Sequence, residues 1–244
     1  MKNFIKLILQ KILGFKNYLF LFSIFKIFTL KYDKEESVFL KMLNLLTEDA
    51  VVLDIGANIG IMTVLLAKKC KQGKIYSFEP IDENFETLVK IVKFFGLKNV
   101  ECHKLAMGDK IDAVKMIMPE VNSVILQGLP HITGISEKEE NGREYTVSQT
   151  SLDIFWEKQN EKISAIKIDV ENYENFVFKG GEKTLVKYKP LIYAELWDNE
   201  NRTKSFTLLK SLGYEIKVSE NNNFCEFIPE KHKTDNFYFF PKLT

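Results

Sequence analysis

The residue types most clearly suited to binding a ligand lie in a stretch with two glycines: Asp54-Ile55-Gly56-Ala57-Asn58-Ile59-Gly60. Gly56 and Gly60 lack side chains where an apolar run would turn into a helix, so the backbone there can approach a ligand closely. Amides freed at the start of a helix favour an anionic group. Asp54 would place a negative charge near a cationic group of the same ligand. The loop therefore predicts a site for a small zwitterionic ligand, with Asn58 beside it.

A carboxylate follows the next apolar run, some two dozen residues after Asp54. Glu79 precedes Pro80, which would end a strand and fix Glu79 at its tip. In nucleotide-binding α/β proteins, a carboxylate at this place accepts hydrogen bonds from ribose hydroxyls. Glu79 is therefore a predicted contact for the ribose of a nucleoside-containing cofactor.

A third group of charges lies in Ile166-Lys167-Ile168-Asp169-Val170-Glu171. Alternation along a strand would put Lys167 and Asp169 on the same face. A lysine in a buried sheet is costly unless it is paired. One interpretation is a purely structural ion pair of Lys167 with Asp169 or Glu195. The other, which we prefer because perturbed charges gather at functional sites, is that Asp169 faces a substrate or cofactor.

The elements that must position these residues alternate between strands and helices. Predicted strands cover residues 51–55, 74–78, 100–106, 163–170, 191–196, 214–218 and 236–240. Predicted helices cover residues 37–46, 60–71, 82–95, 152–159, 176–185 and 202–212, and Gly180-Gly181 should break the one at 176–185. Such alternation predicts an α/β fold with a mostly parallel sheet and helices on both faces. Ligands of these sheets bind beyond the carboxyl ends of the strands, where the loop and Glu79 would lie.

The segment near residues 109–151 departs from this alternation. Short strands are predicted at 116–119, 124–126 and 145–147, with an exposed polar loop at 136–142. We interpret the segment as an insertion over the rim of the site. The chain then consists of a short helical N-terminal extension, residues 1–46, and a domain of residues 47–244 that contains the insertion.

Composition narrows the class of protein. With 244 residues, 45% of them hydrophobic, the chain can bury a large core without disulfides or a structural metal. Its three cysteines stand far apart and lack the spacing of a metal site, so we predict no metal ligands among them and a reducing, cytoplasmic setting. A net charge of only +1 gives no indication of nucleic-acid binding.

The first 31 residues have a charge pattern of their own, with six lysines and no acidic residue. Their longest stretch without a charge or amide, residues 18–25, is far shorter than the roughly 20 residues that span a bilayer. Ile5, Ile8, Leu9 and Ile12 would share one helical face. Such a helix either contacts the inner face of an anionic membrane, or packs on the domain or in a dimer contact. We prefer packing.

Taken in order, the motifs resemble those of the FkbM-type methyltransferases. The matching stretches are Val51 to Gly60, Phe78-Glu79-Pro80, Ala106-x-Gly108-Asp109, Ser151-Leu152-Asp153 and Ile166 to Glu174. The resemblance covers roughly residues 48–196. It implies a Rossmann-like methyltransferase fold and transfer of a methyl group from S-adenosylmethionine to a hydroxyl, often on a sugar or polyketide. The candidate cofactor contacts are then Asp54, Gly56, Asn58, Gly60, Glu79 and Asp109.

Two positions depart from the family pattern. Asn172 stands where the family usually has glycine, but asparagine tolerates left-handed backbone better than most residues. Glu195 is not followed shortly by the histidine that the family often shows there. The turn at Asn172 is therefore expected to survive, whereas a polar role after Glu195 is left open.

The predicted function is O-methylation, dependent on S-adenosylmethionine, of a hydroxyl in a bacterial glycan or its small-molecule precursor. A hydroxyl is a weak nucleophile and needs a proton acceptor, for which Asp169 is the first candidate, followed by Glu171 and Glu195, with Lys167 as charge partner. A divalent cation and a homo-oligomer are left open. The alternatives are a non-catalytic subunit of a membrane-associated complex and a nicotinamide-dependent oxidoreductase. The latter expects a second glycine where this loop has Asn58.

Overall fold

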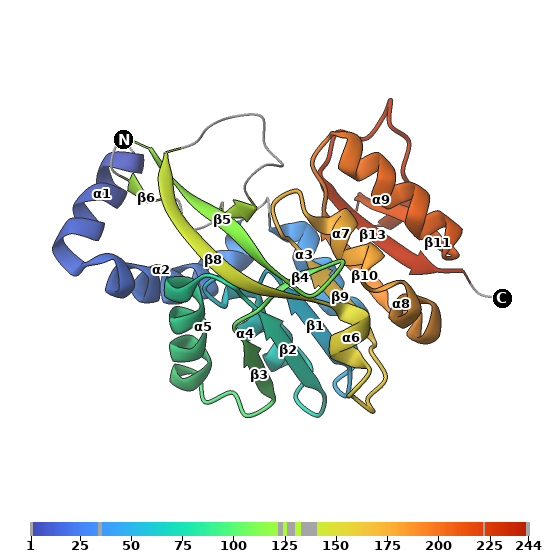
Figure 1. Ribbon diagram of the computed structural model, residues 1–244, viewed down its shortest axis with the longest axis horizontal. Coiled ribbons are helices and arrows are strands. Elements are labelled where there is room, and N and C mark those ends of the chain that lie inside the picture. Colours follow the sequence, from blue (N-terminus) through green and yellow to red (C-terminus); the bar gives the residue numbers. More distant parts are fainter. Residues whose placement is uncertain are drawn as a thin grey trace.

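The structure, a computed structural model, describes residues 2–33, 36–121, 124–125, 130–132, 141–221 and 223–242. Within them, eight strands form the main sheet in the order β12-β11-β13-β10-β9-β1-β2-β3 (Figure 1). In chain order these are β1 (Val51–Ile55), β2 (Lys74–Phe78), β3 (Val100–His103), β9 (Ala165–Ile168), β10 (Leu191–Glu195), β11 (Tyr214–Glu220), β12 (Asn223–Glu226) and β13 (Asn236–Pro241). The five strands from β10 to β3 pair in parallel, and β13, β11 and β12 join them with antiparallel pairing.

Helices cover both faces of this sheet. They are α3 (Ser37–Leu45), α4 (Ile61–Lys69), α5 (Asp82–Phe94), α6 (Leu152–Trp156), α7 (Glu174–Lys179), α8 (Glu182–Tyr188) and α9 (Glu200–Ser211). Val52 of β1 packs with residues of α3 and α4, whereas Leu53 and Ile55 pack with residues of α6 to α9. A strand covered on both sides is apolar at nearly every position, as the sequence of β1 is. The predicted α/β fold with helices on both faces is confirmed.

The rim segment forms a second sheet in the order β4-β8-β5-β6, with β7 paired to β5. Its strands are β4 (Ala106–Gly108), β5 (Asp112–Val121), β6 (Val124–Ile125), β7 (His131–Ile132) and β8 (Gly142–Ser151). β5 and β8 pair from Asp112 opposite Gln149 to Pro119 opposite Gly142, and this ladder arches across the molecule in Figure 1. The strand predicted at 124–126 is the short β6, but those predicted at 116–119 and 145–147 are parts of β5 and β8, which are ten residues long each.

Other boundaries differ from the prediction by a few residues. The predicted strand 100–106 is two strands, since β3 ends at His103 and β4 joins the rim sheet. The helix predicted at 176–185 is α7 and α8, and the predicted break at Gly180 and Gly181 is confirmed. Most of the predicted loop 136–142 lies outside the described residues, and Gly142 already belongs to β8. The predicted division of the chain after residue 46 stays a prediction.

The N-terminal extension begins with two helices, α1 (Lys2–Leu13) and α2 (Phe15–Thr29), followed by a 3-10 turn (Leu30–Tyr32). Gly14 joins them with a φ of 73°, a conformation that favours glycine. α2 contacts α4 and α5 and buries Tyr18, Leu19 and Ile27. The hydroxyl of Ser23 donates a 2.9 Å hydrogen bond to the carbonyl of Ile59 in the glycine loop. α2 therefore packs on the domain, as we preferred.

α1 does not follow that expectation. Its contact with the rim sheet is made by the buried side chain of Gln10, which donates to the carbonyl of Ile125 (3.2 Å) and accepts from the amide of Ile125 (3.3 Å). The side chains on its predicted apolar face, however, are exposed: Ile5, Ile8, Leu9 and Ile12. Packing on the domain therefore does not cover this face, and the dimer contact stays a prediction. Among the described helices, none has the length and apolar character needed to cross a bilayer.

Candidate functional site

A cavity opens at the carboxyl ends of β1, β2 and β9. The space between its walls, open mouth included, is about 600 Å³. Apolar side chains of the rim sheet, including Met116 and Ile132, form part of its wall. Five of the ten predicted site residues also line it: Gly56, Asn58, Glu79, Asp169 and Glu171.

The loop after β1 lies directly against the chain at the end of β9. Gly56 has a φ of 77°, and a Cβ atom there would lie 1.8 Å from the carbonyl oxygen of Asp169. No side chain fits in that space, so glycine is required both by the left-handed conformation and by the close approach. Gly56 thereby brings the loop and Asp169 to the same wall of the cavity.

Three amides of this loop, those of Gly56, Ala57 and Asn58, are already bonded within the protein. Those of Gly56 and Ala57 donate to the carbonyl of Phe78 at 3.0 and 2.9 Å. The amide of Asn58 donates to Oε2 of Glu79 at 2.9 Å. Because β1 and β2 are neighbours, the loop after β1 closes onto the end of β2, and these three amides form their hydrogen bonds there. An anionic ligand group would have to be bound by other donors.

Glu79 lies buried in the cavity wall. Each of its oxygens accepts one backbone N–H, Oε2 from Asn58 and Oε1 from Ile81 (2.9 Å). Burial raises the pKa of Glu79 to about 7 against the opposing effect of these N–H groups. Each carboxylate oxygen retains acceptor capacity for a further donor. This position and chemistry suit the hydroxyls of a ribose.

Asn58 supplies an unpaired polar atom. Its Oδ1 is buried and has no hydrogen-bond partner among the described residues. A buried acceptor without a partner costs about 1–3 kcal/mol, so the site favours a ligand that brings a donor. The amino and hydroxyl groups of S-adenosylmethionine are donors of this kind. Asn58 and Glu79 therefore fit a nucleoside cofactor.

Asp54 does not line this cavity. Its fully buried side chain accepts a 2.6 Å hydrogen bond from the hydroxyl of Thr63. The other oxygen, Oδ1, lies 3.5 Å from Nζ of Lys167. Asp54 and Lys167 are opposite one another in the register of β1 and β9, which brings the two charges together. Asp54 thus stabilises Lys167, and its predicted contact with a cofactor stays a prediction.

Gly60 and Asp109 also lie outside the cavity wall. Gly60 precedes α4 with a φ of 81°, and a Cβ atom there would lie 2.9 Å from the side chain of Leu88 in α5. Its role is to let α4 and α5 pack closely. Asp109 follows β4 and is exposed to solvent. Neither residue is placed as the predicted cofactor contact.

Lys167 is a buried cation just behind the cavity. Its Nζ donates to the carbonyl of Gly56 at 2.8 Å and lies 3.6 Å from Oδ2 of Asp169. Burial opposes the charge, but the carboxylates of Asp169 and Asp54 more than offset burial and raise the pKa of Lys167 above its ordinary value. The side chain of Asp169 is 32% exposed. Lys167 therefore holds Asp169 at the cavity and ties it to the glycine loop.

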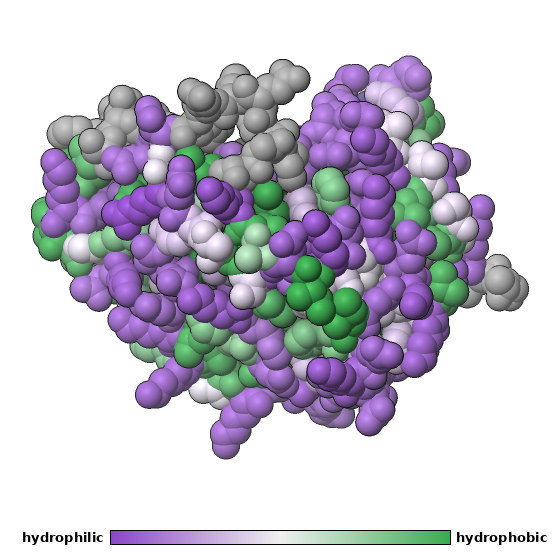
Figure 2. Space-filling view, viewed as in Figure 1, coloured by the Kyte–Doolittle hydropathy of each residue, from purple (hydrophilic) through white to green (hydrophobic). Residues whose placement is uncertain are grey.

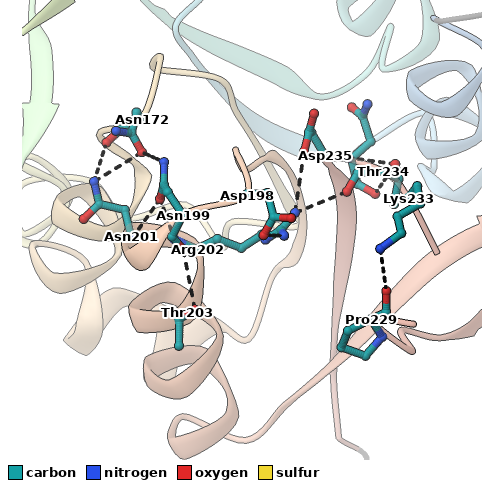
Figure 3. Close-up of polar contacts among 11 residues, drawn as sticks. Asn172, Asp198, Asn199, Asn201, Arg202, Thr203, Pro229, Lys233, Thr234 and Asp235 are labelled. Atoms are coloured by element: carbon teal, nitrogen blue, oxygen red, sulfur yellow. Dashed lines mark hydrogen bonds and ion pairs between the residues drawn. The ribbon is translucent and has the colours of Figure 1, made fainter. Parts of the chain in front are cut away.

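The chain turns in left-handed conformation just after Asp169. Glu171 has a φ of 52° and Asn172 a φ of 73°. Oδ1 of Asn172 accepts hydrogen bonds from the side-chain amides of Asn199 (2.7 Å) and Asn201 (3.2 Å), as Figure 3 shows. The prediction that asparagine tolerates this turn is confirmed. Asn172 also makes contacts with the start of α9 that glycine could not make.

The segment after Glu195 is fixed by an arginine. Arg202 of α9 forms ion pairs with Asp198 and with Asp235, the latter at 3.5 Å (Figure 3). Asn199 caps α9 by accepting from the amides of Asn201 and Arg202. These contacts order the segment in which the family often has a histidine.

The carboxylates around Lys167 influence one another. Burial, followed by the charge of Asp169, raises the pKa of Glu171 to about 9 and that of Glu195 to about 7. Glu195 does not line the cavity. Glu36, from the N-terminal extension, belongs to the same group, because burial raises its pKa and the charge of Asp169 adds to the effect. Sequence reasoning missed Glu36, which stands in no motif and far from Asp169 along the chain.

The carboxyl group of Glu174 gives a prediction about how the stability of the protein depends on pH. It is buried, its Oε1 accepts from the amide of Val170 (3.0 Å), and burial raises its pKa to about 8. The folded state then holds this proton more tightly than the unfolded state. The resulting stability is complete below the unfolded pKa of about 4.3 and is lost as the pH rises to about 8. We expect Glu174→Gln to reduce the slope of the free energy of unfolding against pH by up to about 1.4 kcal/mol per pH unit between pH 5 and 8. Urea denaturation measures this slope.

The matched control for this measurement is Glu200→Gln. Glu200 is an exposed acid at the start of α9, so its replacement should leave the pH dependence of the free energy of unfolding unchanged. A Glu174→Gln variant whose slope equals that of the parent would contradict the assignment.

Comparison with known proteins agrees with this geometry. The methyltransferase FkbM domain matches residues 54–228. "Methyltransferase 1" of Beauveria bassiana is 24% identical over 185 residues, covering 70% of this chain and 74% of that protein. A probable cobalt-precorrin-6B C(15)-methyltransferase (decarboxylating) of Methanococcus vannielii is 31% identical over 124 residues, covering 49% of this chain and 64% of that protein.

A crystal structure of a methyltransferase FkbM from Methylobacillus flagellatus KT has a TM-score of 0.53 at 16% identity, covering 80% of this chain and 44% of that one. The chain thus spans less than half of that structure, and the likeness shows the Rossmann-like fold alone. The domain match begins at the end of β1 and includes Glu79 and Asp169, so it covers all the residues that line the cavity. It leaves no support for the nicotinamide alternative. The chain belongs to the FkbM methyltransferase family and carries its S-adenosylmethionine-dependent methyltransferase domain.

Proposed function

We propose that the chain methylates a hydroxyl group, on a sugar of a bacterial glycan or of a glycan precursor. The observation that carries the proposal is the position of Asp169. Its partly exposed carboxylate lies in the wall of the cavity that also contains Glu79 and Asn58. A proton acceptor next to a cofactor site is what a hydroxyl nucleophile requires.

The residues that would hold the cofactor are Glu79, Asn58 and Gly56. Glu79 would accept from the ribose hydroxyls and Oδ1 of Asn58 from a further donor, while Gly56 keeps the wall open. Bound S-adenosylmethionine supplies an electrophilic methyl group. The protein's remaining tasks are to align the acceptor and to exclude water.

Asp169 would take the proton of the acceptor hydroxyl. The ammonium of Lys167, 3.6 Å away and fully buried, holds this carboxylate in place. Glu171 is a weaker candidate, because its raised pKa leaves it protonated at neutral pH. In the part of the chain that the structure describes, no three acidic side chains of this cavity come together as metal ligands. Asp169 is assigned as the proton acceptor because its partly exposed carboxylate lies in the cavity wall.

The walls also indicate the kind of acceptor. Beside the carboxylates, the cavity is lined by apolar side chains such as Leu105, Met116 and Ile132. No lysine or arginine appears among its described lining residues. This combination suits a neutral polyhydroxylated acceptor better than an acidic one, because hydroxyls donate to carboxylates whereas anions are repelled.

Cofactor binding gives a direct prediction for Glu79. We expect S-adenosylhomocysteine to bind the parent protein, and Glu79→Ala to weaken binding by about 1–3 kcal/mol, the range for charge-assisted hydrogen bonds. Isothermal titration calorimetry measures both. The exposed Glu86→Ala is the matched control, because its carboxylate pairs with Lys16 on the surface. Binding of NAD in place of S-adenosylhomocysteine would overturn the proposal.

The acceptor is tested with cofactor carrying a labelled methyl group. Incubation with neutral sugars, glycan fragments and lipid-linked saccharides should label a product whose methyl group resists alkali, as an ether does. A label released by mild alkali would indicate an ester on a carboxylate acceptor, and a label found on nitrogen would indicate an amine. Either of these two results would refute hydroxyl methylation.

A further inference from the structure

We infer that α1 and α2 form a docking surface for an anionic lipid bilayer. Two rows of exposed apolar side chains carry the inference. On α1 they are Ile5, Ile8, Leu9 and Ile12, which repeat at intervals of three and four residues and so share one face. On α2 the equivalent row is Leu21, Phe25 and Phe28. We call these two rows the outer face.

The outer face is opposite to the side of each helix that packs on the protein. In α2 the buried residues Leu19, Ser23 and Ile27 face α4 and α5. At 100° per residue they lie on the far side of the helix from Phe25, whereas Tyr18 in the first turn is buried on the same side as Phe25, so the exposed row begins at Leu21. In α1 the buried side chain is Gln10, again away from Ile12. Ile12 is 74% exposed and Phe25 is 61% exposed, so folding of the domain leaves the outer face in water.

The charges on α1 and α2 indicate what binds to the outer face. Of the lysines in this segment, Lys16 and Lys26 are paired with carboxylates, at 2.6 and 2.7 Å. Within the described part of the chain, Lys6, Lys11 and Lys31 have no carboxylate at ion-pair distance. On the α1 helix, Lys6 and Lys11 project from the two sides of the apolar row. An apolar row flanked by unpaired cations is the pattern of helices that lie in a bilayer interface.

A second copy of the chain is a poorer occupant. In a two-fold contact the same patch meets itself, so the unpaired lysines of both copies would approach one another without an acidic residue between them. Anionic lipid headgroups supply the missing negative charge, and the acyl region receives the convex apolar row without a matching groove. Figure 2 shows apolar and hydrophilic surface side by side over α1.

The two helices are bonded to the cavity's surroundings. Ser23 donates to the carbonyl of Ile59, next to Asn58 in the glycine loop. Gln10 exchanges two hydrogen bonds with Ile125 of the rim sheet. Docking would therefore hold the domain at the membrane directly and not through a flexible tether. If the proposed glycan acceptor is carried on a lipid, enzyme and acceptor share the surface; docking itself does not depend on that acceptor.

Vesicle flotation with the full chain tests the inference. We expect binding to phosphatidylcholine vesicles that contain phosphatidylglycerol, weak binding to phosphatidylcholine alone, and loss of binding as salt rises from 50 to 500 mM. Lys6→Gln/Lys11→Gln should weaken binding about 25-fold, or about fivefold per lysine. Lys158→Gln/Lys162→Gln removes the same charge from exposed sites after α6 and should bind as the parent does.

The apolar row is tested separately. Ile8→Ser/Ile12→Ser should weaken binding by at least tenfold, because each serine removes apolar area from the lipid interface. Ile111→Ser/Val186→Ser, at exposed apolar sites elsewhere, is the control. Circular dichroism and S-adenosylhomocysteine titration check that each variant is folded. A parent protein that stays unbound at low salt, binds neutral vesicles equally well, or forms a dimer that Ile8→Ser/Ile12→Ser dissociates would overturn the inference.

Discussion

Asp169→Asn is expected to reduce the rate of methyl transfer by about 10²–10⁴-fold, the range attributed to a positioned acid or base. Asparagine keeps the size of the side chain and removes its ability to accept a proton. The fold should survive, because the 32% exposed Asp169 is only one of several partners of Lys167, which retains the carbonyl of Gly56 and the carboxylate of Asp54. Single-turnover assays with labelled cofactor and a competent acceptor measure the effect.

The control and the competing assignment require two further variants. Asp198→Asn removes an exposed carboxylate shortly after β10, outside the cavity wall, and should retain the parent rate. Glu171→Gln should retain most of the rate at pH 7, because its carboxyl is already protonated there. If Glu171→Gln lost turnover while Asp169→Asn kept it, the base would be Glu171. Binding of S-adenosylhomocysteine should change little in all three.

The parts of the site that lie within one strand and its loop could be predicted from the sequence. The order of β1, glycine loop and α4, followed by β2 and Glu79, is contiguous in the chain and set by short-range rules. Alternation along β9 correctly put Lys167 and Asp169 on one face. The turn after Asp169 could also be judged locally, because only a few residue types tolerate the φ of 73° seen at Asn172.

The parts that depend on neighbouring strands could not be predicted. The side chain of Asp54 follows the alternation of β1, but its ion pair with Lys167 requires the register of β1 and β9, and its hydrogen bond from Thr63 requires the packing of α4 on β1. The amides of Gly56, Ala57 and Asn58 looked free in the sequence, but they bond to Phe78 and Glu79 at the end of β2. These are long-range pairings that no local pattern encodes.

The rim sheet was misjudged for a different reason. Its long ladder places Pro119 opposite Gly142, and both residues usually mark the end of a strand. A Cβ atom at Gly142 would lie 2.3 Å from the carbonyl of Met118, so glycine there serves close packing between strands. The same residue types signal a turn in sequence and a tight crossing in the fold, and only the pairing distinguishes them.

Removal of the buried ammonium is expected to have the largest effect on stability. Lys167→Met should lower the free energy of unfolding by about 3–5 kcal/mol, the usual cost of leaving one member of a buried ion pair alone. Asp54 is fully buried, and the variant would leave its carboxylate with only the hydroxyl of Thr63 as a hydrogen-bond donor. The carbonyl of Gly56 would also lose its donor. Urea denaturation at pH 7 measures the loss.

The compensating variant Lys167→Met/Asp54→Asn separates the charge from the packing. Asparagine can still accept a hydrogen bond from Thr63, and it leaves no unpaired charge in the core. We therefore expect the double variant to recover at least half of the lost stability. Lys167→Met/Asp169→Asn should recover little, because Asp169 is partly exposed and water can solvate its carboxylate. Equal recovery in both double variants would show that the cost arises from packing at Lys167. A single variant as stable as the parent would show that Asp54 does not depend on the ammonium at all.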